Sequence, residues 1–441
     1  MRTGRRALAA GIGIAALAVV VTSSGASAAS SGQHIWESGK VVGLADGDTV
    51  YVDVHGHTYS VRNLGIQATE TSHAGVGKNE CGAQQAKKYL TKLTLHKHVQ
   101  LASMHESSES LGRLLRTVYV GTSKDLSRDL DVQAAEMSRG YTLWHPDPTD
   151  SADNLYYHQL QVLAQHKHKH LWDPTFCGKG NDQRIKLKVW VNSDANLSDA
   201  QHPNGEWVGV ENMSKTRTAN LSRWRLRDGS HVDDPAYRFP KHTKLKPHQV
   251  LKLHSGKGHS SVKTRNFYNW GDAKARWDDG DTNGMGEGAY LQDRLGNIRS
   301  SDTYPCVVTA VTSCKDPLTQ DLAWGQVEYA PGGEKQDPNL EYATIRNTSS
   351  RTVNLSYRVV THGGWVRTLM RGTILKPGDE LKIYAGKGHN TPLAQHFGSP
   401  NALFANGGGD VLMRTPDYVQ TMCVDWGNVH TAGCSRASAN Q

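Results

Sequence analysis

The 441-residue sequence has few large apolar side chains: it holds 5 Phe against 44 Gly, and its mean hydropathy is −0.58. A composition of this kind disfavours a helical bundle and indicates polar modules of short strands joined by turns. The chain is also too long to be built around one hydrophobic core, so we expect two to four domains.

Apolar runs long enough to cross a bilayer are missing beyond the first 28 residues. The N-terminus itself has Arg2, Arg5 and Arg6, then the apolar stretch Ala7–Val21, and then a small-residue site at Ala26–Ala28. This is the pattern of a secretory signal peptide. A membrane anchor is the alternative, but the apolar run is short and ends in Thr, Ser and Gly. We therefore expect residues 1–28 to be a signal peptide, and the mature protein to be secreted without a membrane span.

No CxxC pair occurs among the six cysteines, which disfavours a zinc site. In an exported chain six cysteines favour three disulfides, for which fifteen pairings are possible. Closeness along the chain favours two local pairs and leaves the remaining two cysteines at the ends of the first helical segment. The pairs favoured are Cys306–Cys314, Cys423–Cys434 and Cys81–Cys177.

A basic surplus is absent from the first part of the mature chain. The formal net charge of the whole sequence is +8, but residues 29–178 hold 14 Lys and Arg against 16 Asp and Glu. The expected signal peptide accounts for three arginines and no acids, and residues 29–178 have a net charge of −2. The remaining residues 179–441 therefore carry a net charge of +7. Attraction for anionic partners should therefore come from the later part of the chain.

Charged side chains are present at a telling spacing in one early stretch. Asp46 and Asp48 flank a glycine at the start of a β-run, Arg62 and Glu70 lie on the next strand and the loop after it, and Arg113 follows a glycine. Carboxylates for a hard cation, guanidiniums for a phosphate and a carboxylate to activate water are what phosphodiester hydrolysis needs. Each residue alone has an ordinary structural explanation, such as a hairpin turn or a surface charge. Five of them in this order favour a site.

The segments around this stretch include both strands, with alternating apolar residues, and helices, with apolar residues at helical spacing. His55–His57 is expected to be a hairpin turn. Five strands and three helices fit a small Greek-key barrel of the OB type with helices packed on it. The expected strands are residues 41–44, 49–54, 59–66, 99–104 and 114–120, and the expected helices are residues 81–95, 132–139 and 152–166.

Over residues 34–178 the sequence resembles the staphylococcal-nuclease (thermonuclease) family. The resemblance implies an OB-fold barrel, calcium-dependent hydrolysis of DNA and RNA, and 3′-phosphate products. It also implies a role for each residue of the charged stretch. Asp48 and Asp46 would bind Ca²⁺ with the Ala68 carbonyl, Arg62 and Arg113 would clamp the scissile phosphate, and Glu70 would be the general base.

One position departs from the family pattern. Gln67 stands where the family has its second metal-binding aspartate, so a neutral carbonyl oxygen replaces an anion. With one fewer anionic ligand, the site should bind Ca²⁺ more weakly. The departure affects the expected affinity for metal more than the expected reaction.

The second half of the chain contains a long internal repeat. Residues 245–259 recur as residues 375–389 at an offset of 130, and Thr218–Ser222 recurs as Thr352–Ser356. Two copies at domain length indicate a duplicated domain, and the short alternating strands of each copy favour a β-sandwich. Residues 183–314 and 318–434 both resemble the immunoglobulin-like lamin-tail domain, through motifs such as Asn220–Trp224. The second copy is more diverged, with Arg358 in place of Trp224.

Two functions from different classes follow from these observations. The first is a secreted calcium-dependent nuclease whose basic sandwiches tether DNA or RNA through the Gly-Lys-Gly segments around Lys257 and Lys387. The second is a catalytically weak or inactive extracellular protein that binds nucleic acid or anionic cell-envelope polymers. Intact Asp48, Arg62 and Glu70 argue for the first, whereas Gln67 argues for the second.

Overall fold

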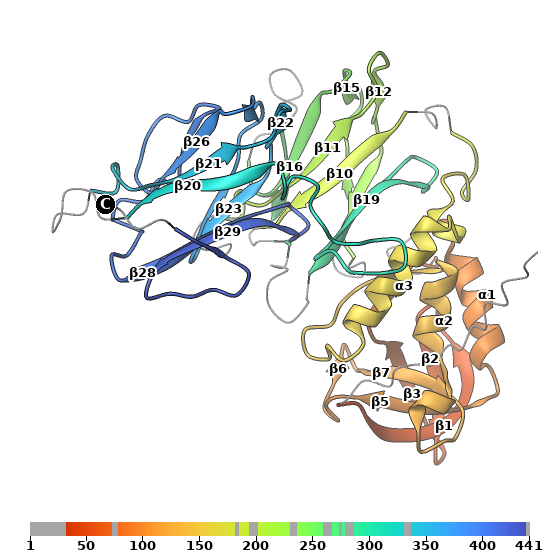
Figure 1. The fold of residues 1–441 in the computed structure, drawn as a ribbon. Helices are drawn as coiled ribbons and strands as arrows, with labels where there is room; N and C mark the ends of the chain where they lie inside the picture. The colour runs from red at the N-terminus through yellow and green to blue at the C-terminus, as the bar shows by residue number, and fades with distance from the viewer. Residues whose placement is uncertain are drawn as a thin grey trace, which may run out of the picture.

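The computed structural model describes residues 32–72, 78–180, 185–193, 202–229, 236–258, 267–272, 276–277, 286–329 and 337–437. The expected signal peptide lies outside these residues. The chain forms an N-terminal region of sheet and helices, followed by a first sandwich and a second sandwich, both built from strands alone (Figure 1). The first sandwich lies between the other two parts, and α3 lies on the side of the N-terminal region that faces it.

The N-terminal region is a closed ring of five strands with three helices on it. The strands pair in the order β3-β2-β1-β5-β7, and a parallel β3–β7 pairing closes the ring. Its core is a cluster of buried aliphatic side chains from all five strands, α1 and α2, including Val50, Val61 and Leu90. The expected mainly β fold with an N-terminal barrel is therefore confirmed. The elements are β1 His34–Leu44, β2 Thr49–Val54, β3 His57–Asn63, β4 Ile66–Ala68, α1 Ala83–Thr94, β5 His98–Ser103, β6 Glu109–Ser110, β7 Arg113–Val120, η1 Leu126–Arg128, β8 Leu130–Asp131, α2 Val132–Arg139, β9 Thr142–Trp144, α3 Asn154–His166 and η2 His170–Trp172.

Two details of the third strand differ from the sequence prediction. His57 lies in β3 and not in the turn, because His55 and Gly56 alone, with φ of +53° and +87°, form the two-residue hairpin turn. The expected single strand over residues 59–66 is broken after Asn63. Gly65 has a φ of +72°, and a Cβ on it would lie 2.6 Å from the ring of Tyr157. The chain therefore turns here, and β4 pairs with β9 outside the ring.

The two sandwiches have matching strand orders. Each has one sheet of four strands, a short two-stranded pair and a second sheet packed face to face, and in both the last strand of the first sheet is parallel to its neighbour. The first sandwich has the orders β10-β11-β16-β17, β12-β15 and β14-β13-β18-β19, and the second has β20-β21-β26-β27, β22-β25 and β24-β23-β28-β29-β30. The first comprises β10 Leu187–Asn192, β11 Trp207–Asn212, β12 Ala219–Asn220, β13 Arg225–Arg227, β14 Tyr237–Arg238, β15 Lys244–Leu245, β16 Val250–Gly256, β17 Phe267–Asp272, β18 Glu287–Gln292 and β19 Ile298–Tyr304. The second comprises β20 Leu322–Glu328, β21 Tyr342–Asn347, β22 Val353–Asn354, β23 Val359–His362, β24 Trp365–Thr368, β25 Ile374–Leu375, β26 Glu380–Tyr384, β27 Ala394–His396, β28 Gly408–Arg414, β29 Gln420–Gly427 and β30 Ser435–Arg436.

Equivalent buried polar residues hold both sandwiches together. Asn212 donates from Nδ2 to the Leu245 carbonyl at 2.9 Å, and Asn347 donates to the Leu375 carbonyl at 3.0 Å. Glu206 and Glu341 are each fully buried, and each accepts two consecutive backbone N–H groups. These shared contacts show that the repeat seen in the sequence is a repeat of structure.

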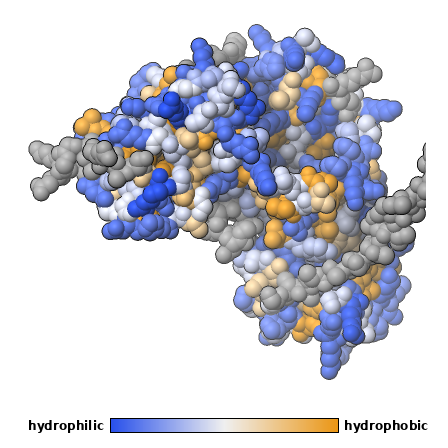
Figure 2. Space-filling model, in the orientation of Figure 1, coloured by the Kyte–Doolittle hydropathy of each residue, from blue (hydrophilic) through white to orange (hydrophobic). Residues whose placement is uncertain are grey.

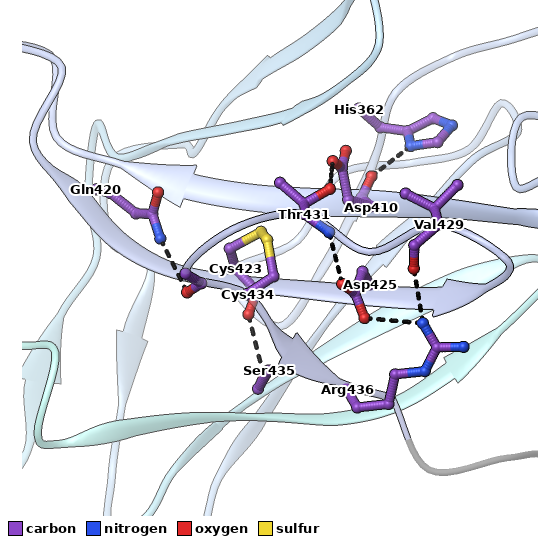
Figure 3. Close-up of a disulfide and its surroundings, with 11 residues drawn as sticks. His362, Asp410, Gln420, Cys423, Asp425, Val429, Thr431, Cys434, Ser435 and Arg436 are labelled. Carbon is purple, nitrogen blue, oxygen red and sulfur yellow. Dashed lines mark hydrogen bonds and ion pairs between the residues drawn. A yellow bond between two sulfur atoms is a disulfide. The ribbon is translucent and has the colours of Figure 1, made fainter.

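Three disulfides join the six cysteines in the pairs that the sequence favours: Cys81–Cys177, Cys306–Cys314 and Cys423–Cys434. The last pair closes the C-terminal loop over β29 (Figure 3). In that loop Thr431 donates from its backbone N to Asp425, and Arg436 pairs with the same carboxylate. This loop brings β30 alongside β29 as a strand for which the sheet of the first sandwich has no equivalent among the described residues.

The N-terminal region and the first sandwich share a small buried core. Leu143, Leu171 and Trp172 pack with Tyr290 and Ile298 in one apolar cluster. Polar contacts from α3 surround it, since the amide Nε2 of Gln161 lies 3.2 Å from the Tyr290 hydroxyl. The outer surface in Figure 2 is mostly polar, with apolar residues in small groups. No helix within the described ranges is long and apolar enough to cross a membrane.

Candidate active site

The aspartate pair lies on a tight turn between β1 and β2. Asp48 is buried and Asp46 is half-buried, and the Asp48 backbone N–H donates to the Asp46 carboxylate at 3.1 Å. Gly47 between them touches α1 and β4, because a Cβ there would lie 2.7 Å from Ala86 and 2.8 Å from Ala68. The glycine therefore lets the turn approach the other side of the site.

The Asp48 carboxylate lies at the centre of this arrangement. Its Oδ2 accepts the backbone N–H of Ala68 at 2.6 Å and lies 3.4 Å from Arg62 Nη2. Burial raises the pKa of Asp48 to about 7; the Arg62 charge opposes the rise, and the Asp46 charge adds to it. Asp48 is therefore only about half ionised near pH 7, and together with Asp46 it still carries more negative charge than one arginine balances.

Arg62 extends from β3 across the site and is only 7% exposed. Its guanidinium donates to the Asn63 carbonyl at 2.7 Å, to the Ile66 carbonyl at 2.9 Å and to Gln67 Oε1 at 2.7 Å. Together with the Asp48 ion pair, these bonds fix the plane of the guanidinium. A fixed, buried guanidinium is suited to hold a phosphate oxygen.

Gln67 links the arginine to the proposed base. Its Oε1 accepts from Arg62, while its Nε2 donates to the Ala68 carbonyl at 2.9 Å and to Glu70 Oε1 at 3.2 Å. In this arrangement Gln67 points an amide N–H, and not its carbonyl oxygen, toward the other expected metal ligand. The expected role of Gln67 as an oxygen ligand therefore requires its amide to turn away from these partners.

Glu70 is held by its backbone as well as by Gln67. The Glu70 N–H donates to Glu80 Oε2 at 3.2 Å, and the Glu80 N–H donates to the Glu70 carbonyl at 2.9 Å. These two bonds close the loop between residues 70 and 80 at its base. Glu80 is followed directly by the Cys81–Cys177 disulfide.

Arg113 begins β7 and is half-buried. In the parallel β3–β7 pair Arg62 is level with Leu115, so Arg113, two residues earlier, projects from the same face of the ring as Arg62. Among the described residues its guanidinium makes one hydrogen bond, to the Ser110 carbonyl at 3.5 Å. Arg113 thus lies on the expected face and, unlike Arg62, is not fixed by several partners.

The residues present fit a bound Ca²⁺ only in part. Two carboxylates on one turn and a nearby backbone carbonyl, that of Ala68, are oxygen donors of the kind that Ca²⁺ prefers. The surplus negative charge on Asp48 and Asp46 also favours a cation. Within the described ranges, however, no three His, Cys, Asp or Glu side chains form a metal-binding group. Any ion held here would need backbone or water ligands.

A third acid beside the aspartates was not identified from the sequence. Glu136 on α2 has no exposed surface, and neither carboxylate oxygen has a hydrogen-bond partner of good geometry among the described residues, although the Asn63 side chain interacts with it. Burial raises the pKa of Glu136 well above its usual range, and the negative charges of Asp48 and Asp46 add to the effect. Its position in the pattern of α2, between Gln133 and Met137 on the buried face, was the available signal.

The first sandwich also contributes to the site, which the sequence did not indicate. Arg225 and Arg227 of β13 each lie 3.5 Å from the Glu80 carboxylate. A Cβ on Gly229, just beyond β13, would lie 2.9 Å from the Trp144 carbonyl. Burial and the positive charges of Arg62 and Arg227 lower the pKa of His145 to about 4 despite the opposing charge of Asp147, so this imidazole is neutral at pH 7.

The lysines expected to tether substrate lie elsewhere. Lys257 and Lys387 are exposed, and their flanking glycines are packed within each sandwich, since a Cβ on Gly258 would meet Asn269 and one on Gly388 would meet His396. Lys252 is held above the Trp207 ring at 3.6 Å, and its equivalent Lys382 above the Tyr342 ring at 4.1 Å. The glycines therefore serve packing, and only the exposed lysines are free to contact an anionic polymer.

Comparison with known protein families agrees with this division of the chain. Residues 60–174 match the family model described as staphylococcal nuclease homologue, and residues 178–305 match the lamin tail domain model. No curated protein matches the chain. The family models give no second match over the second sandwich. The chain therefore carries a staphylococcal-nuclease homologue domain followed by a lamin tail domain.

Proposed function

We propose that the protein is a secreted, calcium-dependent nuclease that hydrolyses phosphodiester bonds of DNA and RNA at the site around Arg62. The observation that carries the proposal is the bonded chain Asp48–Arg62–Gln67–Glu70, which unites an acid for a cation, a fixed guanidinium and a carboxylate for water activation. Three disulfides are consistent with an extracellular protein. We take residues 34–178, 183–314 and 318–434 as the three domains, the last being a diverged lamin-tail domain.

The proposed reaction is an in-line attack of water on phosphorus that breaks the bond to the 5′-oxygen, so that the phosphate stays on the 3′-oxygen and the leaving 5′-oxygen takes up a proton from solvent. Glu70 accepts a proton from the attacking water, and Arg62 and Arg113 hold the equatorial phosphate oxygens as negative charge develops on them. Neutral His145 adds no positive charge of its own, so the positive charge that faces the phosphate comes from Arg62 and Arg113. A Ca²⁺ held by Asp48, Asp46 and the Ala68 carbonyl would polarise a phosphate oxygen.

Substitution of the proposed base tests this assignment. Glu70→Gln should lower the rate of DNA hydrolysis by about 10²- to 10⁴-fold, because it removes general base catalysis while keeping the hydrogen bond to Gln67. Arg113→Ala should have an effect of about 10²-fold or more, since it removes a transition-state contact and no core contact. Arg128→Ala, an exposed arginine of the same region, is the matched control and should keep wild-type rates. Normal rates in folded Glu70→Gln and Arg113→Ala would rule out this site.

The alternative function, an extracellular binding protein with weak or lost catalysis, rests on Gln67. Gln67→Asp restores a carboxylate and removes the amide donor that faces Ala68. Half-maximal activity should then need less Ca²⁺ than in the wild type, as read from a calcium titration of DNA hydrolysis after chelation. An unchanged or higher requirement would exclude Gln67 from the metal site. A wild-type protein that binds DNA but does not cleave it at any calcium concentration would establish the alternative.

A further inference from the structure

The two arginines on β13 share one face of a strand whose other face is in the sandwich core. Leu226 between them is fully buried in the hydrophobic cluster of the first sandwich. Alternation along the strand therefore turns Arg225 and Arg227 away from that core and toward the N-terminal region. Both guanidiniums meet the same carboxylate, since Arg225 Nη1 lies 3.5 Å from Glu80 Oε1 and Arg227 Nη1 lies 3.5 Å from Glu80 Oε2.

Glu80 passes this contact on to the proposed base. The same Oε2 that faces Arg227 accepts the backbone N–H of Glu70 at 3.2 Å. The path from the sandwich to Glu70 therefore consists of one ion pair and one hydrogen bond. Its last step acts on the backbone of residue 70, which sets where the Glu70 carboxylate can reach.

Arg227 is placed in a way that a simple interface anchor does not require. Its side chain is 2% exposed, and its Nε and Nη2 have no hydrogen-bond partner among the described residues. A buried charge with unmet donors is unfavourable for stability, so such a group is often retained for another reason. Burial lowers the pKa of Arg227, and the negative charges of Glu80, Asp228 and Glu70 act against that change. The guanidinium is therefore within electrostatic reach of the base itself.

The internal duplication supplies a comparison within the same chain. Arg223 and Tyr357 are equivalent residues with φ of +64° and +67°, and counting forward places Val359 opposite Arg225 and Thr361 opposite Arg227. Strand pairing supports this equivalence, because β13 pairs with β18 and β23 pairs with β28. In each sandwich that partner is the strand that follows the parallel edge strand, β17 or β27, along the chain. The sandwich that packs on the N-terminal region has the two arginines, and the other, whose described residues make no contact with that region, has neither.

We infer that the first sandwich is a working part of the nuclease centre, and that Arg227, supported by Arg225, is a positioning residue that acts through Glu80 to hold Glu70 in place for catalysis. This inference rests on the proposed function. It assigns the lamin tail domain a role in the chemical step and not only in substrate capture. An ion pair that merely joined the two domains would instead affect stability, with no specific effect on Glu70.

The kinetic test uses the full mature chain with four variants. Arg227→Met removes the charge but keeps the length of the side chain, and Glu80→Gln breaks the same ion pair from its more exposed partner. Each should lower kcat by about 10- to 100-fold with KM within about threefold, because displacement of a catalytic group by about 1 Å has effects of this size. Arg227→Lys should recover most of the lost kcat, since it keeps a cation opposite Glu80. Arg346→Met, an exposed strand arginine of the second sandwich, is the control and should be unchanged.

The same variants are compared by hydrogen exchange at the amide of Glu70, which donates to Glu80 in the wild type. Exchange there should be at least about tenfold faster in Arg227→Met and Glu80→Gln than in the wild type and in Arg346→Met. Wild-type exchange and wild-type kcat in the two folded variants would overturn the inference, and faster exchange with unchanged kcat would limit Arg227 to an anchor. If Glu70→Gln retains full activity, the proposed function fails separately, while the exchange measurement still reports whether Arg227 positions Glu70.

Discussion

The two sandwiches have the same strands but are attached to the rest of the chain in different ways. The first packs on the N-terminal region through the apolar cluster around Tyr290 and Trp172. It also contacts that region through Asn297, which accepts the Cys177 N–H at 2.7 Å.

The second meets the first through aromatic contacts, in which Tyr304 stacks on Tyr418 at 5.7 Å and Trp190 lies 5.1 Å from Tyr357, and these contacts border an open cavity of about 550 Å³. Polar and aromatic side chains, including Lys188, Tyr357 and Asp417, line this cavity. The first junction is a closed apolar core, whereas the second combines a few aromatic contacts with an open polar cavity, so the first should resist separation of the domains more strongly.

Charge divides along the same boundary. Residues 179–317 hold 22 Lys and Arg against 16 Asp and Glu, while residues 318–441 hold 11 against 10. The net charge of +6 is therefore in the sandwich that packs on the acidic nuclease region, and the second sandwich has only +1. Similarity of fold thus predicts neither attachment nor electrostatic role, since both depend on which side chains cover the outer faces.

Truncation gives the largest expected contrast between the sandwiches. A chain of residues 29–317 should keep nuclease activity within about threefold, because no described residue of the second sandwich contacts the site, although the truncation uncovers Tyr304 and Trp190. A chain of residues 29–178 should lose at least about 100-fold, because it exposes Leu143 and Trp172 and removes the contact to Glu80. Turnover of a fluorescent oligonucleotide measures both. Equal activity in the two truncated chains would show that the first sandwich is as dispensable as the second.

Matched substitutions in the two sandwiches should differ in stability. Tyr290→Ala removes a fully buried ring from the shared core, and we expect a loss of about 3–5 kcal/mol in the free energy of unfolding. Leu412 is the equivalent residue of the second sandwich. It pairs with Thr361 in the same way that Tyr290 pairs with Arg227, but its side chain is only half-buried. Leu412→Ala should lose about 1–2 kcal/mol. Denaturant titrations followed by tryptophan fluorescence and by residual nuclease activity should show that only Tyr290→Ala lowers both midpoints.

The hydrogen bonding of a buried glutamate distinguishes the N-terminal region from both sandwiches. Glu206 and Glu341 accept backbone N–H groups, whereas Glu136 accepts none among the described residues. Burial raises the pKa of Glu341, and it raises that of Glu136 well above the usual range. The unfolded chain releases the Glu136 proton above about pH 4.3, whereas the folded chain retains it, so stability decreases as pH rises from there toward the folded pKa.

Glu136→Gln keeps a neutral side chain and removes this effect. Its advantage in stability over the wild type should be absent near pH 4 and should grow by up to about 1.4 kcal/mol per pH unit as the pH rises. Thermal unfolding at several pH values in the presence of a chelator measures the difference. A constant difference between pH 4 and pH 8 would mean that Glu136 is ionised in the fold.

The smallest expected effect concerns substrate capture. Lys257→Ala should lower the slope of log affinity against log salt by about one unit on long DNA, because one phosphate contact is lost. Lys387→Ala, the equivalent change in the nearly neutral second sandwich, should leave the slope unchanged. A salt series by fluorescence anisotropy would detect the difference. Equal slopes for both variants and the wild type would remove the sandwiches from substrate capture.

The fold could be predicted largely because its signals are local. Alternation over Thr49–Val54 and helical spacing over residues 81–95 predicted β2 and α1, and the repeat predicted the duplication. What the sequence did not show was the break at Gly65, where contact with Tyr157 of a distant helix decides the conformation. A single sequence carries no sign of such a contact between elements.

The candidate site was predicted in the same uneven way. Asp48, Arg62, Gln67 and Glu70 belong to a motif, and the structure joins them by one ion pair and two hydrogen bonds. Arg227 lies 157 residues beyond Glu70 in the chain and belongs to a different sandwich motif. Its role depends on how two domains pack, and no pattern within either domain specifies that. The sequence identified Gln67 as the departure from the family pattern. The direction of its amide follows only from the positions of Arg62 and the Ala68 carbonyl in the structure.

The disulfide of the nuclease region has a consequence for how the gene can be rearranged. The Cys81–Cys177 bond lies against Gly296, where a Cβ would approach Cys81 to 3.1 Å, and beside Asn297. A recombination event that joined residues 34–178 to an unrelated partner would leave this cross-link and the Glu80 carboxylate without their neighbours. The smallest unit that keeps the centre whole therefore extends to the end of β19, and an exchange beyond it would still uncover Tyr304, which stacks on Tyr418 of the second sandwich.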